Sequence, residues 1–313
     1  MGMNRLRTMA VLAAAFVAAT LLPASPVQAV AERYKPFVLA WRGTADFEQK
    51  VSDVKGRLES AGFEVVTEFE PYGEGAHVDR AKIIVFTSDE LKKIAAKSKM
   101  GGFAAPMRVG VTLVGDDLQV SYVNPIYMAH AYRLKSDLSE VADKLAEAVG
   151  RIETFGSRKG LTAKKLARYR YTFGMERFDK PYRLAQYGSH AEAVREVEER
   201  LNSNDVGISM VYRIDIPGSD EVVFGVRRKG QGEDGKYYDD QWIMSNVDFE
   251  DLKGTPYLPY EIMVKGNEAI ALHMRFRMAV HYPDLKMMGA NSFMNLMPSP
   301  KAIEKAFKAA LGQ

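Results

Sequence analysis

Two of the five histidines in this chain end similar stretches of sequence. Residues 121–132 read "SYVNPIYMAHAY" and contain His130, whereas residues 273–284 read "HMRFRMAVHYPD" and contain His281. In both stretches a strand pattern runs into a turn that holds a methionine and then reaches the histidine. The repetition raises the question of whether the two imidazoles serve one site.

Soft metal ligands accompany these histidines. Neutral imidazole and thioether groups suit Cu(I) or a haem iron, so a site for copper or haem is one interpretation. If the halves of the chain pack about a pseudo-two-fold axis, His130 and His281 would meet at the interface. The competing interpretation is packing or an ordinary hydrogen bond, because methionine fills irregular cores. The candidate ligands are His130, His281, His273, Met128 and Met278.

The remaining chemistry-bearing residues form no motif that names a reaction. The chain contains neither a G-x-S-x-G elbow nor an H-E-x-x-H pattern. Asp234, Asp239 and Asp240 crowd a polar stretch, but they lack the regular spacing of a calcium loop. We therefore expect a non-catalytic protein, although the sequence leaves the question of an enzyme open.

The first residues have the pattern of a secretory signal peptide. Arg5 and Arg7 precede the apolar run of residues 9–22, and small residues lead to an expected cleavage site after Ala29. The apolar run is too short to span a bilayer comfortably, so we expect a soluble periplasmic protein. Without cysteine the chain has no disulfide, thiolate metal site or lipid anchor on cysteine. Removal of the signal peptide lowers the formal net charge from +3 to +1, which gives no case for nucleic-acid binding.

Internal repeats organise the rest of the chain. Apolar positions of the first half recur in the second half at offsets of 143, 151 and 162 residues. The offset grows because the second half carries insertions, such as the polar residues 227–240. We interpret the pattern as a diverged tandem duplication. The matches are Val51, Val54 and Leu58 with Val194, Val197 and Leu201, residues 115–130 with 266–281, and residues 141–150 with 303–312.

Each half has the same predicted order of elements. Strands alternate with amphipathic helices, and "MRVGVTLV" and "LQVSYV" around "GDD" predict a hairpin. We expect two similar α+β domains, each a mainly antiparallel sheet with helices packed on one face. Helix 47–60 should correspond to 190–201, and helix 137–149 to 299–311. The predicted segments are a signal peptide (1–29), a first domain (30–150), a basic aromatic linker (151–181) and a second domain (182–313).

The first half resembles a family of bacterial domains of unknown function, the one numbered three hundred and two. The similarity covers most of residues 36–150 and is carried by Gly62-Phe63, Pro106 and Asn124-Pro125. It is weaker in residues 182–312, where Leu258-Pro259 remains but the "NP" turn does not.

The resemblance implies a fold but no reaction. It implies a small α+β sandwich that often pairs with a copy of itself, and a tandem fusion would supply that copy within one chain. Several relatives carry a cysteine next to the proline that opens a strand. Met107 and Tyr260 stand at these places here, so no thiol chemistry carries over.

The predicted linker is strongly basic. Residues 151–180 hold nine Lys or Arg against three acids, with aromatic residues interleaved. Two functions follow: a periplasmic binding protein that holds a small molecule, copper or haem in the cleft between two domains, or a module that docks on a membrane surface or a protein partner through this linker. For the linker itself, a solvated connector that packs its aromatic residues on both domains is the competing interpretation.

Overall fold

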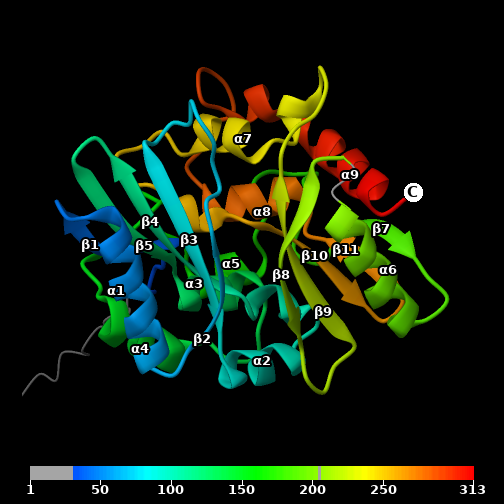
Figure 1. Cartoon of the computed structure of the whole chain (residues 1–313), viewed down its shortest axis with the longest axis horizontal. Helices are drawn as coiled ribbons and strands as arrows, with labels where there is room; N and C mark the ends of the chain where they lie inside the picture. The colour runs from blue at the N-terminus through cyan, green and yellow to red at the C-terminus, as the bar shows by residue number, and fades with distance from the viewer. Residues whose placement is uncertain (1–30, 204–205) are drawn as a thin grey trace, which may run out of the picture. The chain divides into compact units, whose positions relative to one another are not determined.

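The first half of the chain forms a six-stranded antiparallel sheet (Figure 1). The computed structural model describes residues 31–203 and 206–313, so the predicted signal peptide lies outside the described residues. The strand order is β2-β3-β4-β5-β1-β6. The strands are β1 (Phe37–Gly43), β2 (Glu64–Phe69), β3 (Arg80–Thr87), β4 (Met107–Val114), β5 (Asp117–Val123) and β6 (Glu153–Phe155).

The second half forms a five-stranded antiparallel sheet with the order β7-β11-β10-β9-β8. When β7 is matched to β1, and β8 to β11 are matched to β2 to β5, this order, read from its other end, equals that of the first sheet without β6. The predicted α+β class with antiparallel sheets is confirmed, whereas a common origin of the halves stays a prediction. The strands are β7 (Tyr182–Gln186), β8 (Ile208–Asp215), β9 (Glu221–Arg228), β10 (Tyr260–Lys265) and β11 (Glu268–Ala271).

Helices cover the sheets and fill the connections. Helices α1 and α4 pack on the first sheet, while α6 and α9 pack on the second. The α-helices are α1 (Phe47–Ser60), α2 (Asp89–Ala96), α3 (Pro125–Ala131), α4 (Ser139–Val149), α5 (Ala163–Ala167), α6 (His190–Ser203), α7 (Asp240–Val247), α8 (Met274–His281) and α9 (Ser299–Ala310). The 3₁₀ turns are η1 (Gly101–Ala104), η2 (Gly235–Tyr237), η3 (Thr255–Tyr257) and η4 (Phe293–Leu296).

Side-chain caps set several helix starts. The Ser189 hydroxyl accepts a hydrogen bond from Glu192 N (3.2 Å), as a capping box requires. Thr87 and Glu90 also have the spacing of a capping box, but the cap of α2 lies one residue later. Ser88 caps α2 by accepting from Leu91 N (3.1 Å), because the Thr87 hydroxyl donates instead to the Ala105 carbonyl.

The two faces of the first sheet differ in character. Over residues 107–112 of β4 and 118–122 of β5, the residues toward α1 and α4 are apolar, and the alternate residues are polar or small but still buried. The second half covers this polar face. The Thr112 hydroxyl donates a hydrogen bond to the Thr255 hydroxyl (2.8 Å), and the Ser121 hydroxyl donates to the Lys253 carbonyl (3.1 Å). The polar-face residues are Arg108, Gly110, Thr112, Gln119 and Ser121.

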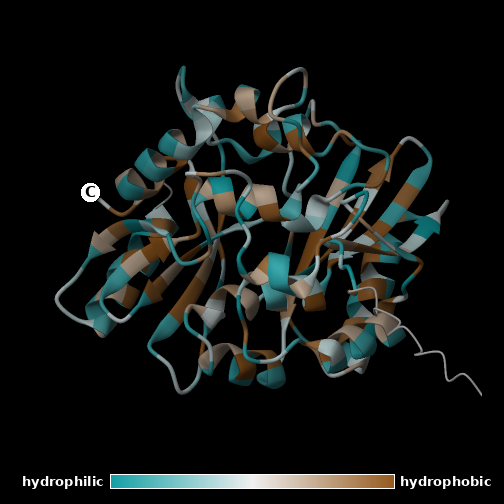
Figure 2. Ribbon diagram, turned by 180° about the vertical axis from the view of Figure 1, so that it is seen from behind, coloured by the Kyte–Doolittle hydropathy of each residue, from teal (hydrophilic) through white to brown (hydrophobic). Residues whose placement is uncertain are grey.

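The halves share a core. Residues 32–313 form one compact unit, and one cluster of buried apolar side chains contains residues of both halves. Figure 2 shows hydrophobic residues gathered in the strands, whereas the helices carry many hydrophilic positions. Among the described residues, each helix falls short of the length and apolar character needed to cross a bilayer.

Candidate functional site

His281 lies at the end of α8 and is fully buried. Its Nδ1 donates to the carbonyl oxygen of Arg277 (2.7 Å), and its Nε2 has no hydrogen-bond partner among the described residues. Burial, reinforced by the positive charges of Arg277 and Arg108, holds the pKa of His281 well below its ordinary value. The imidazole is therefore neutral near pH 7.

His130 occupies a different environment in α3. It is half-buried, and its ring centroid lies 5.2 Å from that of Tyr34. Helix α3 begins after its cap Asn124 and α8 begins after its cap His273, so the two histidines stand six and eight residues beyond their caps. The match in sequence is therefore not a match in helical position. The reason is that β11 is shorter than β5. Counted from the hairpin turn that precedes each strand, α8 therefore begins two residues sooner than α3.

The other predicted ligands have roles of their own. His273 stands at the start of α8, where its Nδ1 caps the helix by accepting from Arg275 N (3.2 Å). Met128 and Met278 are buried in the core. Within residues 31–203 and 206–313, no three His, Cys, Asp or Glu side chains are grouped to hold a metal ion. The copper or haem site stays a prediction, and this geometry gives it no support.

Opposite charges meet at equivalent positions of the two halves. Arg108 is the second residue of β4, and Glu261 is the second residue of β10. The guanidinium and the carboxylate form an ion pair across the interface, with side-chain exposures of only 3% and 2%. Arg108 Nε also donates to the Pro256 carbonyl (2.9 Å). Such a pair fixes how the halves fit, because an uncompensated charge at this depth is costly.

A second buried arginine completes this cluster. Arg277 Nε donates to the second carboxylate oxygen of Glu261 (3.1 Å). Its Nη2 donates to the carbonyls of Tyr257 and Pro259, both at 2.6 Å. Burial opposes the charge of Arg277, but Glu261 and the nearby tyrosines raise its pKa above the ordinary value. One carboxylate thus serves two arginines, and the cluster is a structural clamp between the halves.

A cleft of about 620 Å³ lies where the edge of the first sheet meets the second half. Its walls are β6 with the start of β1, residues 247–254 at and beyond the end of α7, and residues 282–291 after α8. The volume lies within the range of small-molecule sites, which are commonly found at such junctions.

The floor of this cleft is aromatic. The rings of Phe37 and Phe155 stack with centroids 5.4 Å apart, and the ring of Tyr282 lies 5.9 Å from Phe37. Gly254 permits this packing, since a Cβ there would lie 2.7 Å from Tyr282 Oη and 3.0 Å from a Phe37 ring carbon. Burial, with Asp248 nearby, raises the pKa of Tyr282 well above its ordinary value, and its hydroxyl donates to the Gly254 carbonyl (3.2 Å).

The rim carries charges of both signs. Asp248 is committed to the fold, accepting from Gly254 N (2.6 Å) and lying 3.3 Å from His77 Nε2. Asp284 accepts from Arg158 N (2.5 Å). Phe249 adds an apolar side chain that is 44% exposed. The charged lining residues are Lys35, Arg158, Lys286, Glu153, Asp248, Glu250, Asp251 and Asp284.

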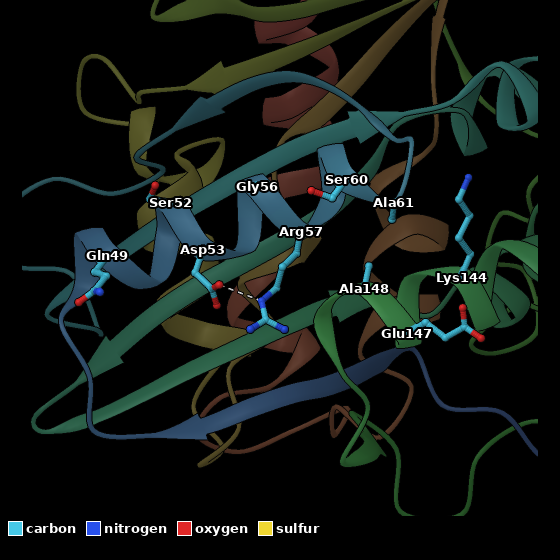
Figure 3. Close-up of a pocket in the computed structure, with 10 residues that line it drawn as sticks. All are labelled: Gln49, Ser52, Asp53, Gly56, Arg57, Ser60, Ala61, Lys144, Glu147 and Ala148. Carbon is cyan, nitrogen blue, oxygen red and sulfur yellow. Dashed lines mark hydrogen bonds and ion pairs between the residues drawn. The ribbon is translucent and has the colours of Figure 1, made fainter.

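A second hollow lies between α1 and α4, on the outside of the first sheet (Figure 3). Its volume is larger, about 830 Å³, but its lining is polar or small and contains no aromatic residue. Asp53 and Arg57 on α1 bond each other across one turn (2.8 Å). Without an apolar floor, this hollow is the weaker candidate for a ligand site.

The loop after β9 contains a glycine pattern similar to that of nucleotide-binding loops. Gly230, Gly232 and Gly235 have the spacing of a dinucleotide-binding loop. However, β9 belongs to an antiparallel sheet, and the Asp239 carboxylate accepts a hydrogen bond from Gly230 N (2.9 Å). A carboxylate at this place repels phosphate, so the loop is structural.

The predicted linker is ordered and packed. Its residues include β6, which pairs with β1 of the first sheet, and α5. The hydroxyls of Tyr169 and Tyr171 donate to the carbonyls of Ala279 (2.8 Å) and Leu285 (2.9 Å) in the second half. This agrees with a connector that packs its aromatic residues, while the domain boundaries at residues 150 and 181 stay predictions.

None of the aromatic floor residues was anticipated as a site residue. Phe37 and Tyr282 are ordinary core residues by sequence, and a cleft between segments far apart in the chain leaves no local pattern. The sequence signal that points to the cleft is the greater length of two connections in the second half. Of these, only residues 227–240 are recognisable in the sequence, by their polar composition.

A comparison with protein families finds a match within the first half of the chain. Residues 40–152 match the model of a family described as "Domain of unknown function DUF302". No curated protein matches the chain. The match begins within β1 and ends just before β6, so it takes in α1 to α4 and leaves out the second sheet. Residues 40–152 of this chain therefore form a DUF302-like domain.

Proposed function

We propose that this is an exported, non-catalytic binding protein that holds a small molecule in the cleft between its two halves. The observation that carries the proposal is the aromatic floor of Phe37, Phe155 and Tyr282 at the bottom of a cleft of ligand size. Ligand sites commonly combine an apolar surface with polar groups that fix orientation, and this cleft joins an aromatic floor to a charged rim.

The floor and rim suggest the chemistry of the ligand. A flat apolar or aromatic body would lie against Phe249 and the exposed edges of Phe155 and Tyr282, with Phe37 buried beneath them, since aromatic contacts favour such surfaces. A polar end would reach the rim, where Lys35, Lys286 and Glu153 are available. The ligand class is therefore an amphipathic organic molecule rather than copper or haem held by the predicted histidines and methionines.

Non-catalytic binding also fits the polar groups of the cleft. Tyr282 stays protonated because its pKa is raised, and Asp248 and Asp284 already accept backbone hydrogen bonds. These groups hold the cleft in shape rather than offering a free nucleophile or base.

Export rests on the sequence of residues 1–29. N-terminal sequencing of the protein in a periplasmic extract should find Val30 as the first residue. Met1 retained on a protein in the membrane fraction would contradict export without affecting the cleft.

A binding titration tests the cleft itself. The uncharged fluorophore 1-N-phenylnaphthylamine should bind with one saturable site, and Thr154→Trp should abolish this by filling the cleft from β6. Thr67→Trp is the matched control, because Thr67 is also half-buried on an edge strand but lies on β2, at the other edge of the sheet. Equal binding by both folded variants would refute the site, as would no binding by the unmodified protein.

A further inference from the structure

The connector between the halves carries a cluster of unpaired cations. Lys164, Lys165, Arg168 and Arg170 line a hollow of about 330 Å³ around α5. In the part of the chain that the structure describes, none of the four lies within ion-pair distance of a carboxylate, whereas Arg133 and Arg158 each pair with an aspartate. Four uncompensated positive charges in one place create a local positive field on a nearly neutral chain.

An exposed aromatic side chain adjoins this cluster. Phe173 is 88% exposed, and the Arg170 guanidinium lies 5.1 Å from the centre of its ring. Tyr169 and Tyr171 anchor the same segment to the second half through their hydroxyl groups. The charges and the protruding ring are therefore held on a fixed support.

We propose that this basic aromatic surface, defined by Lys164, Lys165, Arg168, Arg170 and Phe173, docks on an anionic lipid membrane. Basic side chains near an anionic bilayer each add to the attraction, and an aromatic ring inserts at the level of the headgroups. A protruding ring flanked by cations suits a lipid interface, because insertion removes its apolar surface from water. Docking would bring the protein to a membrane while its cleft remains a separate site.

Vesicle co-sedimentation tests the surface on the full mature protein. Binding to phosphatidylcholine vesicles that contain phosphatidylglycerol should weaken about fivefold for each charge removed, or roughly a hundredfold for Lys164→Gln/Lys165→Gln/Arg168→Gln. Phe173→Ser should weaken binding about tenfold. Added salt should weaken the binding of the unmodified protein.

Matched variants separate this surface from general charge and exposure. Lys301→Gln/Lys305→Gln removes two exposed charges on α9, and Met288→Ser removes an apolar side chain that is 72% exposed. Both should bind the vesicles as well as the unmodified protein. Equal losses in these controls would overturn the proposal, as would equal binding to pure phosphatidylcholine. Competition by a soluble acidic peptide at the same surface would also overturn it, in favour of a protein partner.

Discussion

The two halves of this protein share a strand order but differ in two connections. From β3 to β4 the first half uses residues 88–106, whereas the matching connection from β9 to β10 in the second half uses the longer 229–259. Between the last two helices, the first half uses residues 132–138 and the second half uses 282–298. Both longer connections contribute walls of the cleft. The candidate site therefore belongs to the parts in which the halves differ.

The interface shows a second difference between equivalent positions. Arg108 and Glu261 would carry like charges if the halves were identical, and like charges facing each other cost several kcal/mol. Within a single chain the two positions can carry different residues and be complementary. The shared strand order supplies the frame, whereas the differences between the halves supply the fit and the cleft.

The largest expected effect comes from removing the shared carboxylate. Glu261→Gln should lower the free energy of unfolding by about 3–5 kcal/mol, because it leaves Arg108 and Arg277 buried without a counter-charge. Urea unfolding measures the change. Glu268→Gln, which removes an exposed partner of Arg183, should cost no more than about 1 kcal/mol.

Removing one arginine should have a smaller effect. Arg108→Met should cost about 1–3 kcal/mol in the same measurement, because Glu261 keeps its bond to Arg277. Comparing how much the two variants lower the free energy of unfolding is a sharper test than either value alone. If Arg108→Met destabilises as much as Glu261→Gln, the shared-carboxylate description of the interface is wrong.

The pH dependence of stability should reveal the buried His281. Its pKa is depressed in the folded protein, so the unfolded chain binds the extra proton, and stability is lost as pH falls below about 6.5. Relative to His281→Asn, the folded protein should lose about 1.4 kcal/mol for each pH unit below that point. His190→Asn controls for the loss of a histidine bond to a backbone carbonyl (2.8 Å). Parallel pH profiles for the unmodified protein and His281→Asn would contradict the assignment.

A small substitution compares the cleft with the hollow on the first half. Gly254→Ala should destabilise by about 1–2 kcal/mol and weaken fluorophore binding, because its Cβ would press on Tyr282 and Phe37. Gly56→Ala, in α1 beside the outer hollow, meets nothing within 4 Å and should leave binding unchanged. Loss of binding in Gly56→Ala alone would move the site to that hollow.

The sequence predicted the frame better than the site. Apolar periodicity gave the α+β class and placed α1 and α6 because a buried helical face leaves a local pattern. The paired histidines matched in sequence but not in helical position, since an offset in sequence does not record where a strand ends and a helix begins. The aromatic floor could not be predicted, because Phe37 and Tyr282 meet only after the halves have packed.

Hydrogen–deuterium exchange with and without 1-N-phenylnaphthylamine tests the central claim most directly. We expect the bound fluorophore to slow exchange in residues 152–158, 247–254 and 282–291, which form the cleft. Helices α1 and α4, which form the outer hollow, should exchange at the same rate in both samples. Slowing confined to α1 and α4, or unchanged exchange in all three cleft segments at saturation, would contradict the claim that the cleft is the binding site.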